Sequence, residues 1–481
     1  MIKTILLITT TIACFCCLRG QNIHVDERFE LTGVVFRLTG IGVFQQEEPQ
    51  VYLSEVDREF SKFKNHELIE FVKKTIETKV DFPFNFICDL SADIEITSKG
   101  IVFTDRWLTY YDDYKCFDDE EYWTKSEMEE YLRLLNKFYK DTKFRKFFFT
   151  HREYYEITEN NFKEIADQID KDWFSRFFGK PLEIENIWIS PVLGHHNFSL
   201  IRTDKNGQLF HNCIIGCSYV DSHGNPVFGH SHFSVLVHEI CHNYNNPICD
   251  KYKDDFKEIC DTIEKYMGSV LAENHYSGAE NILYEGMNRV CEYSYYKDDT
   301  VYYKDTLLFN ILVDAEEMKG FVWLDEILRY MDIFYRNRDK YSKFEDFFPE
   351  LRSFMQNVAD NMKDYYLPKL QTKAPVVLAT FPANNSIVDT SLSEIVIYFS
   401  KPMCVQGCMT GIMDQLGDNE TTFPIEYGKD NMQWKDAYTH VTKLNHKLQP
   451  HSQYGFYIRC GAVDDKTHTC CKYYKLIFKT K

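Results

Sequence analysis

Two histidines four residues apart, with a glutamate between them, are the residues whose types and spacing point most directly to chemistry. They are His238, Glu239 and His242, within residues 234–244. On a helix, residues i and i+4 lie on one face, so both imidazoles can bind the same metal ion. The spacing therefore predicts a metal site at the two histidines, with Glu239 beside it as the base that takes a proton from water.

A helix over residues 231–245 must position these side chains. Three apolar residues form a stripe on the face opposite the histidines, so one face packs on a core and the other lines a cleft. These are Leu236, Ile240 and Tyr244. A surface His-Glu-His cluster is the alternative, but histidines without partners in so apolar a helix would leave costly unpaired polar groups. Pro247 predicts that the helix ends just past His242.

A third metal ligand is expected from an acidic residue on another helix, as in metallopeptidases that use two histidines and a glutamate. The helical pattern over residues 281–296 places Glu285 and Glu292 on one face, about 10 Å apart, so only one can reach the metal. We predict Glu285, because Arg289 one turn later can orient its carboxylate. A plain helix salt bridge between Glu285 and Arg289 is the alternative, and Glu292 is expected in core packing or a surface pair.

Residues 189–198, upstream of the predicted metal-binding helix, contain His195, His196 and Asn197. In such peptidases an extended edge strand pairs with the substrate backbone, and this segment is our candidate for that strand. We predict His195 or His196 as a donor to the developing oxyanion, and Asn197 as a further substrate-binding residue. Two loop histidines without a catalytic role are the alternative.

The composition is that of a globular protein of several domains. The 481 residues allow roughly two to four domains, and 44% of them are hydrophobic while 27% are charged. Asp and Glu (73) outnumber Lys and Arg (55), which gives a net charge of -18. This charge opposes binding to a polyanion, so the composition excludes nucleic acid as an expected partner.

The first 20 residues are typical of an export signal. Lys3 precedes an uncharged apolar run over residues 4–18, which is too short for a comfortable membrane span. Cleavage near Gly20 gives a secreted or periplasmic protein. The alternative is a lipoprotein anchored to the membrane at Cys14, because this cysteine ends the apolar run as in a bacterial lipobox.

A change of hydrophobic periodicity near residues 367–375 predicts a domain boundary. Residues 25–370 carry mainly helical patterns with scattered strand-like pieces, such as 29–36 and 198–202, and are predicted as one α+β domain. Residues 374–481 instead alternate with period two in short runs separated by Pro, Gly, Asn and Asp. This pattern is typical of an all-β sandwich.

The C-terminal region resembles the bacterial Ig-like domains of surface-layer and other exported proteins. The resemblance rests on Phe-Pro-Ala-Asn-Asn at residues 381–385 and on Ile-Val-Ile-Tyr-Phe-Ser-Lys-Pro-Met at residues 395–403. It implies a spacer or adhesion role for residues 374–481 rather than catalysis.

Residues 26–367 resemble a group of exported bacterial HExxH proteins, long carried as a domain of unknown function and similar to gluzincin-type zinc metallopeptidases. The motifs behind this are Phe29-Glu30-Leu31, Phe36-Arg37-Leu38, Val56-Asp57 through Phe60 to His66, Trp173 with Phe177-Phe178-Gly179-Lys180, His238-Glu239-Ile240-Cys241-His242 with Asn246-Pro247, and Tyr284-Glu285 with Arg289. The chain departs from the pattern at Gly286 and Cys291, where a better helix former and a small residue are expected. The resemblance implies Zn²⁺ and hydrolysis of peptide bonds.

The sequence thus predicts an exported zinc metallopeptidase acting on a protein or peptide substrate. Its fold is expected to be a mainly helical, zincin-like α+β domain followed by an all-β Ig-like sandwich. The alternative is a noncatalytic cell-envelope binding or adhesion protein with a structural or vestigial metal site. Glu239 favours the enzyme, because a structural site has no use for a base between its histidines. A zinc hydrolase of a non-peptide bond is a third hypothesis, and the oligomeric state is not encoded in any recognisable motif.

Overall fold

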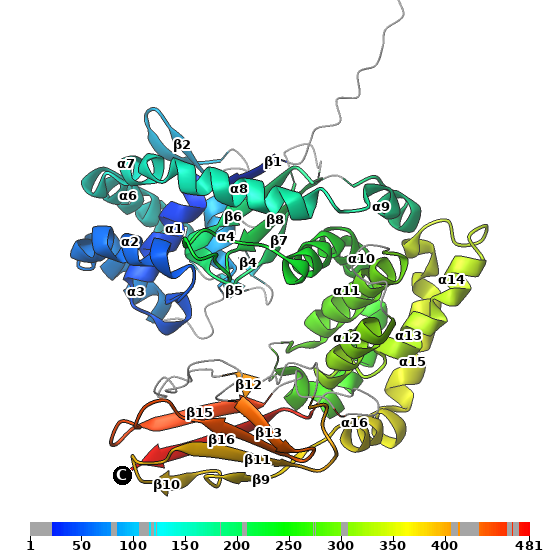
Figure 1. Ribbon diagram of the computed structural model, residues 1–481. Helices are drawn as coiled ribbons and strands as arrows, with labels where there is room; N and C mark the ends of the chain where they lie inside the picture. Colours follow the sequence, from blue (N-terminus) through cyan, green and yellow to red (C-terminus); the bar gives the residue numbers. More distant parts are fainter. Residues whose placement is uncertain are drawn as a thin grey trace, which may run out of the picture. The chain divides into compact units, whose positions relative to one another are not determined.

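The computed structural model describes residues 22–77, 84–104, 115–116, 120–121, 123–182, 184–203, 209–272, 274, 276–299, 306–405, 412–413, 432–458, 464 and 471–481. The predicted export signal, with Cys14, lies outside these residues. The described chain is mainly helical and carries several small sheets, which confirms the α+β class (Figure 1). It divides into two compact units: Met1–Ile165 with Glu183–Phe228, and Ala166–Leu182 with Gly229–Lys481.

The first unit contains a four-stranded sheet in the order β1-β6-β8-β7. Its strands are β1 (Asn22–Val25), β6 (Asn186–Ser190), β7 (Phe198–Thr203) and β8 (Leu209–Gly216). β6 pairs in parallel with both β1 and β8, whereas β7 pairs antiparallel with β8. The expectation of an edge strand over residues 189–198 is therefore wrong. β6 lies between two strands and gives way at Pro191 to a 3₁₀ turn, η4 (Pro191–Leu193), because proline has no N–H for the ladder.

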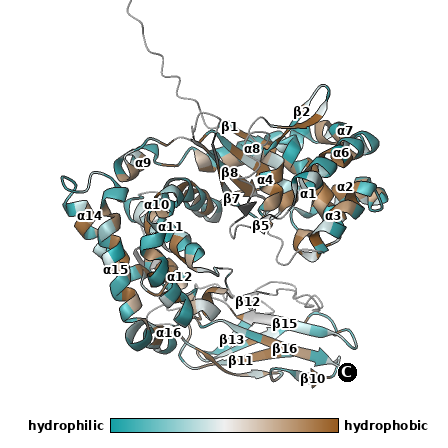
Figure 2. Cartoon of the chain, turned by 180° about the vertical axis from the view of Figure 1, so that it is seen from behind, coloured by the Kyte–Doolittle hydropathy of each residue, from teal (hydrophilic) through white to brown (hydrophobic). Residues whose placement is uncertain are grey.

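Between β1 and β6, the part of the described chain that belongs to the first unit forms seven α-helices. They are α1 (Glu27–Leu38), α2 (Gln50–Phe60), α3 (Glu67–Glu77), α4 (Phe86–Ala92), α6 (Lys125–Thr142), α7 (Phe144–Thr150) and α8 (Arg152–Ala166), with a hairpin of β2 (Ile94–Thr97) and β3 (Gly100–Phe103) and the short strands β4 (Lys115–Cys116) and β5 (Glu120–Glu121). Residues 29–36, predicted as strand-like, lie in α1. This helix is capped by Asp26, whose carboxylate accepts a hydrogen bond from Arg28 N at 2.9 Å. α1 is buried nearly all round, and hydrophobic residues occupy much of α1 and α4 (Figure 2). Because residues 29–36 are buried on nearly all sides, their hydrophobicity does not follow the 3.6-residue period of an amphipathic helix.

Glu30, in the first turn of α1, is fully buried. Its Oε2 accepts a hydrogen bond from Tyr52 OH at 2.5 Å, and its Oε1 accepts one from Ser190 Oγ at 2.6 Å. Tyr52 OH also lies 2.8 Å from Tyr155 OH of α8. Burial raises the pKa of Glu30 to about 7, although the hydrogen bonds from Ser190 and Tyr52 act in the opposite direction. The carboxyl group therefore joins α1, α2 and the end of β6 by polar contacts inside the unit.

Replacing Glu30 with glutamine is expected to change how the free energy of unfolding depends on pH. The folded pKa of about 7 lies above the ordinary value of 4.5, so this group stabilises the fold at low pH. That stability is lost as the pH rises from about 4.5 through about 7, and amounts to about 3 kcal/mol. The amide of Glu30→Gln cannot ionise. The unfolding free energy of the variant minus that of wild type should therefore increase from about pH 5 to about pH 8, because only the wild type loses stability through this group. Urea titrations followed by circular dichroism measure this difference, and a difference that does not change with pH would contradict the prediction.

The second unit is helical up to residue 373. Its helices are α9 (Lys171–Phe178), α10 (His230–Ala272), α11 (Ala279–Asp298), α12 (Thr306–Met318), α13 (Leu324–Tyr330), α14 (Asp332–Arg336), α15 (Phe348–Asp360) and α16 (Leu367–Lys373), with η5 (Phe344–Phe347) and a π-helical turn, η6 (Met362–Tyr366). α11 packs along α10 (Figure 1). Among the described residues, no helix combines the length and the apolar character that crossing a membrane requires.

The helix that carries the two histidines does not end where we expected. α10 continues through Pro247 as far as Ala272, so the helix predicted over residues 231–245 is the first part of a helix of 43 residues. A proline inside a helix removes one hydrogen bond and costs about 3 kcal/mol. Residues buried beyond the proline offset this cost; they include Cys249, Phe256, Ile259 and Ile263.

After α16 the chain forms two four-stranded sheets, in the orders β13-β14-β11-β9 and β10-β16-β15-β12. The strands are β9 (Val377–Phe381), β10 (Ser386–Val388), β11 (Glu394–Phe399), β12 (Ile412–Met413), β13 (Met432–Asp436), β14 (Thr439–Lys443), β15 (Gln453–Ile458) and β16 (Tyr474–Thr480). One hydrophobic core joins the two sheets, with Ile395 and Ile397 from β11 and Leu476 and Phe478 from β16. The predicted change from helices to strands thus falls between α16 and β9, whereas the compact units divide residues 25–370 between them.

Candidate metal centre

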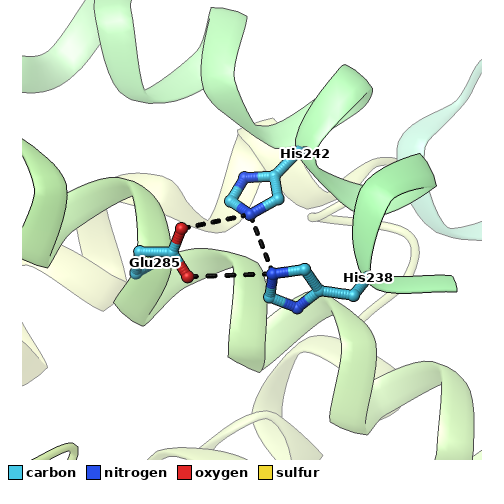
Figure 3. A group of neighbouring side chains, drawn as sticks. All are labelled: His238, His242 and Glu285. Atoms are coloured by element: carbon cyan, nitrogen blue, oxygen red, sulfur yellow. Dashed lines mark hydrogen bonds and ion pairs between the residues drawn. The ribbon is translucent and has the colours of Figure 1, made fainter. Parts of the chain in front are cut away.

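Three predicted ligands come together in the second unit. His238 and His242 project from α10 and Glu285 from α11, and their donor atoms turn toward one another (Figure 3). The two Nε2 atoms lie 3.0 Å apart; Glu285 Oε1 lies 3.4 Å from His242 Nε2, and Glu285 Oε2 lies 3.8 Å from His238 Nε2. Among the described residues, this is a group that could hold a metal ion, with one donor atom from each side chain.

The outer nitrogen of each histidine has a partner that fixes its proton. His238 Nδ1 lies 2.9 Å from Glu292 Oε2, and a carboxylate only accepts, so the proton sits on Nδ1. His242 Nδ1 likewise donates to Asn246 Oδ1 at 3.0 Å. Both Nε2 atoms are then left as acceptors that face each other. Two lone pairs at 3.0 Å repel unless a cation or a proton lies between them.

Glu292, expected in core packing or a surface pair, instead holds the imidazole of His238. Its second oxygen accepts a hydrogen bond from the hydroxyl of Tyr296, and the oxygen of this hydroxyl also lies 3.2 Å from Ser234 O. Asn288 Nδ2 donates to the backbone carbonyl of His238 at 3.1 Å. Sequence reasoning missed these supporting contacts. The spacing of seven residues between Glu285 and Glu292 nevertheless placed both on the face of α11 that meets α10.

The electrostatics of the cluster favour positive charge at the imidazoles. Burial lowers the pKa of His238, but the carboxylates of Glu292 and Glu285 outweigh it and raise that pKa to about 9. Burial raises the pKa of Glu285, but the charges of His242 and Arg289 hold it well below its usual range. A cation held by these side chains would meet the same carboxylates.

Glu239 follows His238 on α10 and is 8% exposed. Burial raises its pKa, while the charges of His238 and His242 lower it. No residue in the part of the chain that the structure describes donates a hydrogen bond to its carboxylate. The carboxylate is therefore available to accept a proton, and the predicted role of Glu239 as the base stays a prediction.

Arg289 contacts Glu285 as predicted, with Nη1 2.7 Å from Glu285 Oε2. The pair is not a surface bridge, because Arg289 is only 2% exposed. Its Nε donates to Glu316 Oε2 at 2.6 Å, a contact with α12 that sequence reasoning did not find. No local signal identifies such a partner, because the pair is 27 residues apart in the chain.

His195, His196 and Asn197 lie in the first unit, between η4 and β7. His196 stacks on Phe84, with ring centroids 3.7 Å apart, and burial lowers its pKa to about 3. Asn197 donates to His195 O at 2.9 Å and accepts from Gly216 N at 3.0 Å, so it holds the turn before β7. These contacts belong to their own unit, and the predicted role of the three residues in substrate binding stays a prediction.

Comparisons with known proteins give a family and distant structural likenesses. A family model described as "Domain of unknown function (DUF4932)" matches residues 23–353. No curated protein sequence matches the chain. CopC from Methylosinus trichosporium OB3b is 13% identical over 22% of this chain and 93% of its own, with a TM-score of 0.17. Surface layer protein SbsC, domains 1-6, is 16% identical over 51% of this chain and 33% of its own, also at 0.17.

Proposed function

The chain belongs to the DUF4932 family, whose description assigns no activity, and from the site itself we propose a zinc-dependent metallopeptidase of the HExxH type. One observation carries the proposal. The Nε2 atoms of His238 and His242, both set as acceptors by their outer partners, converge with the carboxylate of Glu285. Glu239, the residue between the histidines, remains available as a base.

The donor set fits zinc. Zinc takes imidazole nitrogen and carboxylate oxygen at about 2.0–2.2 Å in tetrahedral geometry, so two ligands of one ion are about 3.3 Å apart. The two Nε2 atoms are 3.0 Å apart and Glu285 Oε1 is 3.4 Å from His242 Nε2, and both separations are close to this value. Three protein ligands and an open fourth position are the usual composition of a catalytic zinc site, whereas structural sites are closed by four.

When bound, zinc supplies a Lewis acid and lowers the pKa of water that it binds to about 7. Glu239 accepts a proton from water as the water oxygen attacks the scissile carbonyl carbon. It then passes this proton to the nitrogen of the leaving amine, so that the peptide C–N bond breaks and a carboxylic acid and an amine are released. Glu292 and Asn246 hold the two imidazoles in the tautomer that keeps Nε2 directed at the reacting centre.

We extend the proposal to the architecture and location of the protein. The helices that carry the site are proposed to be zincin-like, of the gluzincin type, because the third ligand is a glutamate on a second helix. The two sheets after residue 376 are proposed to be an Ig-like domain, which their shared core supports. The N-terminal sequence supports export, to the periplasm or outside the cell, with a lipid anchor at Cys14 as the alternative.

Metal content and hydrolysis, measured on the same sample, test the proposed activity. The purified chain is expected to hold about one zinc per molecule by elemental mass spectrometry, and to cleave members of a random peptide pool. Cleavage should stop with a zinc chelator and return when zinc is added back. A chain that holds zinc, cleaves no peptide and binds an envelope polymer would instead support the noncatalytic adhesion protein. A chain that binds no metal would overturn the site.

A further inference from the structure

α12 supplies no donor atom to the candidate metal centre, yet it carries a partly buried acidic residue, Glu316, that contacts the proposed ligand Glu285 through one side chain. Glu316 Oε2 accepts a hydrogen bond from Arg289 Nε at 2.6 Å, and Glu316 Oε1 accepts one from Lys319 Nζ at 2.6 Å. Arg289 Nη1 in turn donates to Glu285 Oε2 at 2.7 Å. The four side chains form a row of alternating charge that starts at the metal ligand and ends at the C-terminal end of α12.

The guanidinium of Arg289 is held on every side that the structure describes. It lies over the ring of Phe321 at 4.0 Å and over the ring of Tyr276 at 4.6 Å. Its Nη1 also donates to the backbone carbonyl of Glu285 at 3.0 Å. A planar guanidinium stacked by rings and paired at two edges has little freedom to turn. Its orientation is therefore set by Glu316 and the two rings together.

This orientation decides which oxygen of Glu285 is available. Oε2 accepts a short, charge-assisted hydrogen bond from Arg289 and lies 3.8 Å from His238 Nε2, whereas Oε1 lies nearer to a histidine, 3.4 Å from His242 Nε2. A carboxylate with one oxygen held in this way offers a metal the other oxygen alone. The site then keeps an open position for water, which a glutamate binding through both oxygens would reduce.

We propose that Glu316 is a positioning residue of the metal centre: it fixes Arg289, and Arg289 holds Glu285 so that only Oε1 faces the metal. This inference rests on the proposed metal site and adds α12 to it. Without Glu316, the buried charge of Arg289 is balanced by Glu285 alone. The guanidinium of Arg289 can then pair with both oxygens of Glu285 and draw the carboxylate away from the metal.

The test compares two neighbouring glutamates of α12. Glu316→Gln is expected to lower zinc affinity about 10- to 100-fold, the usual cost of removing a partner behind a metal ligand. Glu317→Gln is the matched control. Glu317 is 3% exposed and ion-paired, but with Lys369 Nζ at 3.1 Å rather than with Arg289. Zinc affinity, measured by competition with a chelating dye, should stay at the wild-type value in this control.

A double variant covers the case in which Glu316→Gln leaves Arg289 buried without its partner and the chain fails to fold. Arg289→Met removes the charge and keeps the length of the side chain, so Glu316→Leu can be added without leaving a buried arginine unpaired; Lys319, the other partner of Glu316, has a side chain that is 28% exposed to water. Since Glu316 acts through Arg289, Glu316→Leu should not lower zinc affinity further in the Arg289→Met background. A further loss of zinc affinity in this background would overturn the proposal.

Cobalt substitution gives a readout that a purely structural role would not move. Arg289→Met frees Oε2, so the visible absorption of the cobalt form should weaken as Glu285 adds its second oxygen to the metal. An unchanged spectrum would overturn the proposal. If wild type binds zinc but Glu316→Gln and Glu317→Gln behave alike, only the positioning role of Glu316 fails. If wild type binds no metal, the proposed function fails with it.

Discussion

Replacing Glu239 with glutamine is expected to lower the rate of peptide hydrolysis well beyond a hundredfold, while the fold and the bound zinc remain. The amide has the shape of the carboxylate but cannot accept a proton at neutral pH. General base catalysis contributes about 10²- to 10⁴-fold, so the loss should fall in this range. The measurement is kcat/KM on the best substrate found in the peptide pool, together with zinc content by mass spectrometry.

Glu258→Gln serves as the matched control for this experiment. Glu258 lies on the same helix, α10, but its side chain is exposed. The same substitution there should leave activity at the wild-type level. If Glu239→Gln keeps near-normal activity, Glu239 is not the base. The adhesion alternative gains if, in addition, wild type cleaves nothing.

The second large effect is expected at the third ligand. Glu285→Ala should lower zinc affinity by several orders of magnitude, because it removes one of three protein donors and leaves Arg289 without one of its two carboxylates. Glu292→Ala should cost only about 10- to 100-fold, since Glu292 holds the imidazole of His238 and donates nothing to the metal. Zinc titration of both variants measures the difference.

The assignment of the third ligand depends on which of the two variants loses more zinc affinity. If Glu292→Ala loses zinc and Glu285→Ala keeps it, the assignment of the third ligand is wrong. Far-UV circular dichroism of both metal-free variants separates loss of a ligand from loss of the fold, because α10 and α11 dominate the helical signal around the site.

The three side chains of the candidate metal site were predictable because they depend on local geometry. The spacing of four residues puts His238 and His242 on one face of any helix, and the spacing of seven puts Glu285 and Glu292 on one face of the next. Which glutamate would face the metal followed from its neighbour Arg289, and the structure pairs these two residues.

What could not be predicted depends on contacts between distant segments. Pro247 stops an isolated helix, but burial of residues beyond it carries α10 on to Ala272. The apolar run over residues 29–36 suits a strand or a helix buried on all sides, and only its surroundings decide between them. No sequence motif identifies Glu316, because it is connected to the site only through its hydrogen bond with Arg289, between α12 and α11.

The proline in α10 also has a mechanical consequence. A helix rises 1.5 Å per residue, so the arm from Pro247 to Ala272 is about 38 Å long, whereas the arm back to His242 is about 8 Å. Prolines are the usual places where helices bend. A bend of about 5° at Pro247 moves the far end of α10 by about 3 Å, but it moves the turn that carries His242 by less than about 1 Å. A bend at Pro247 would therefore displace the far end of α10 more than the turn that carries the candidate metal ligands.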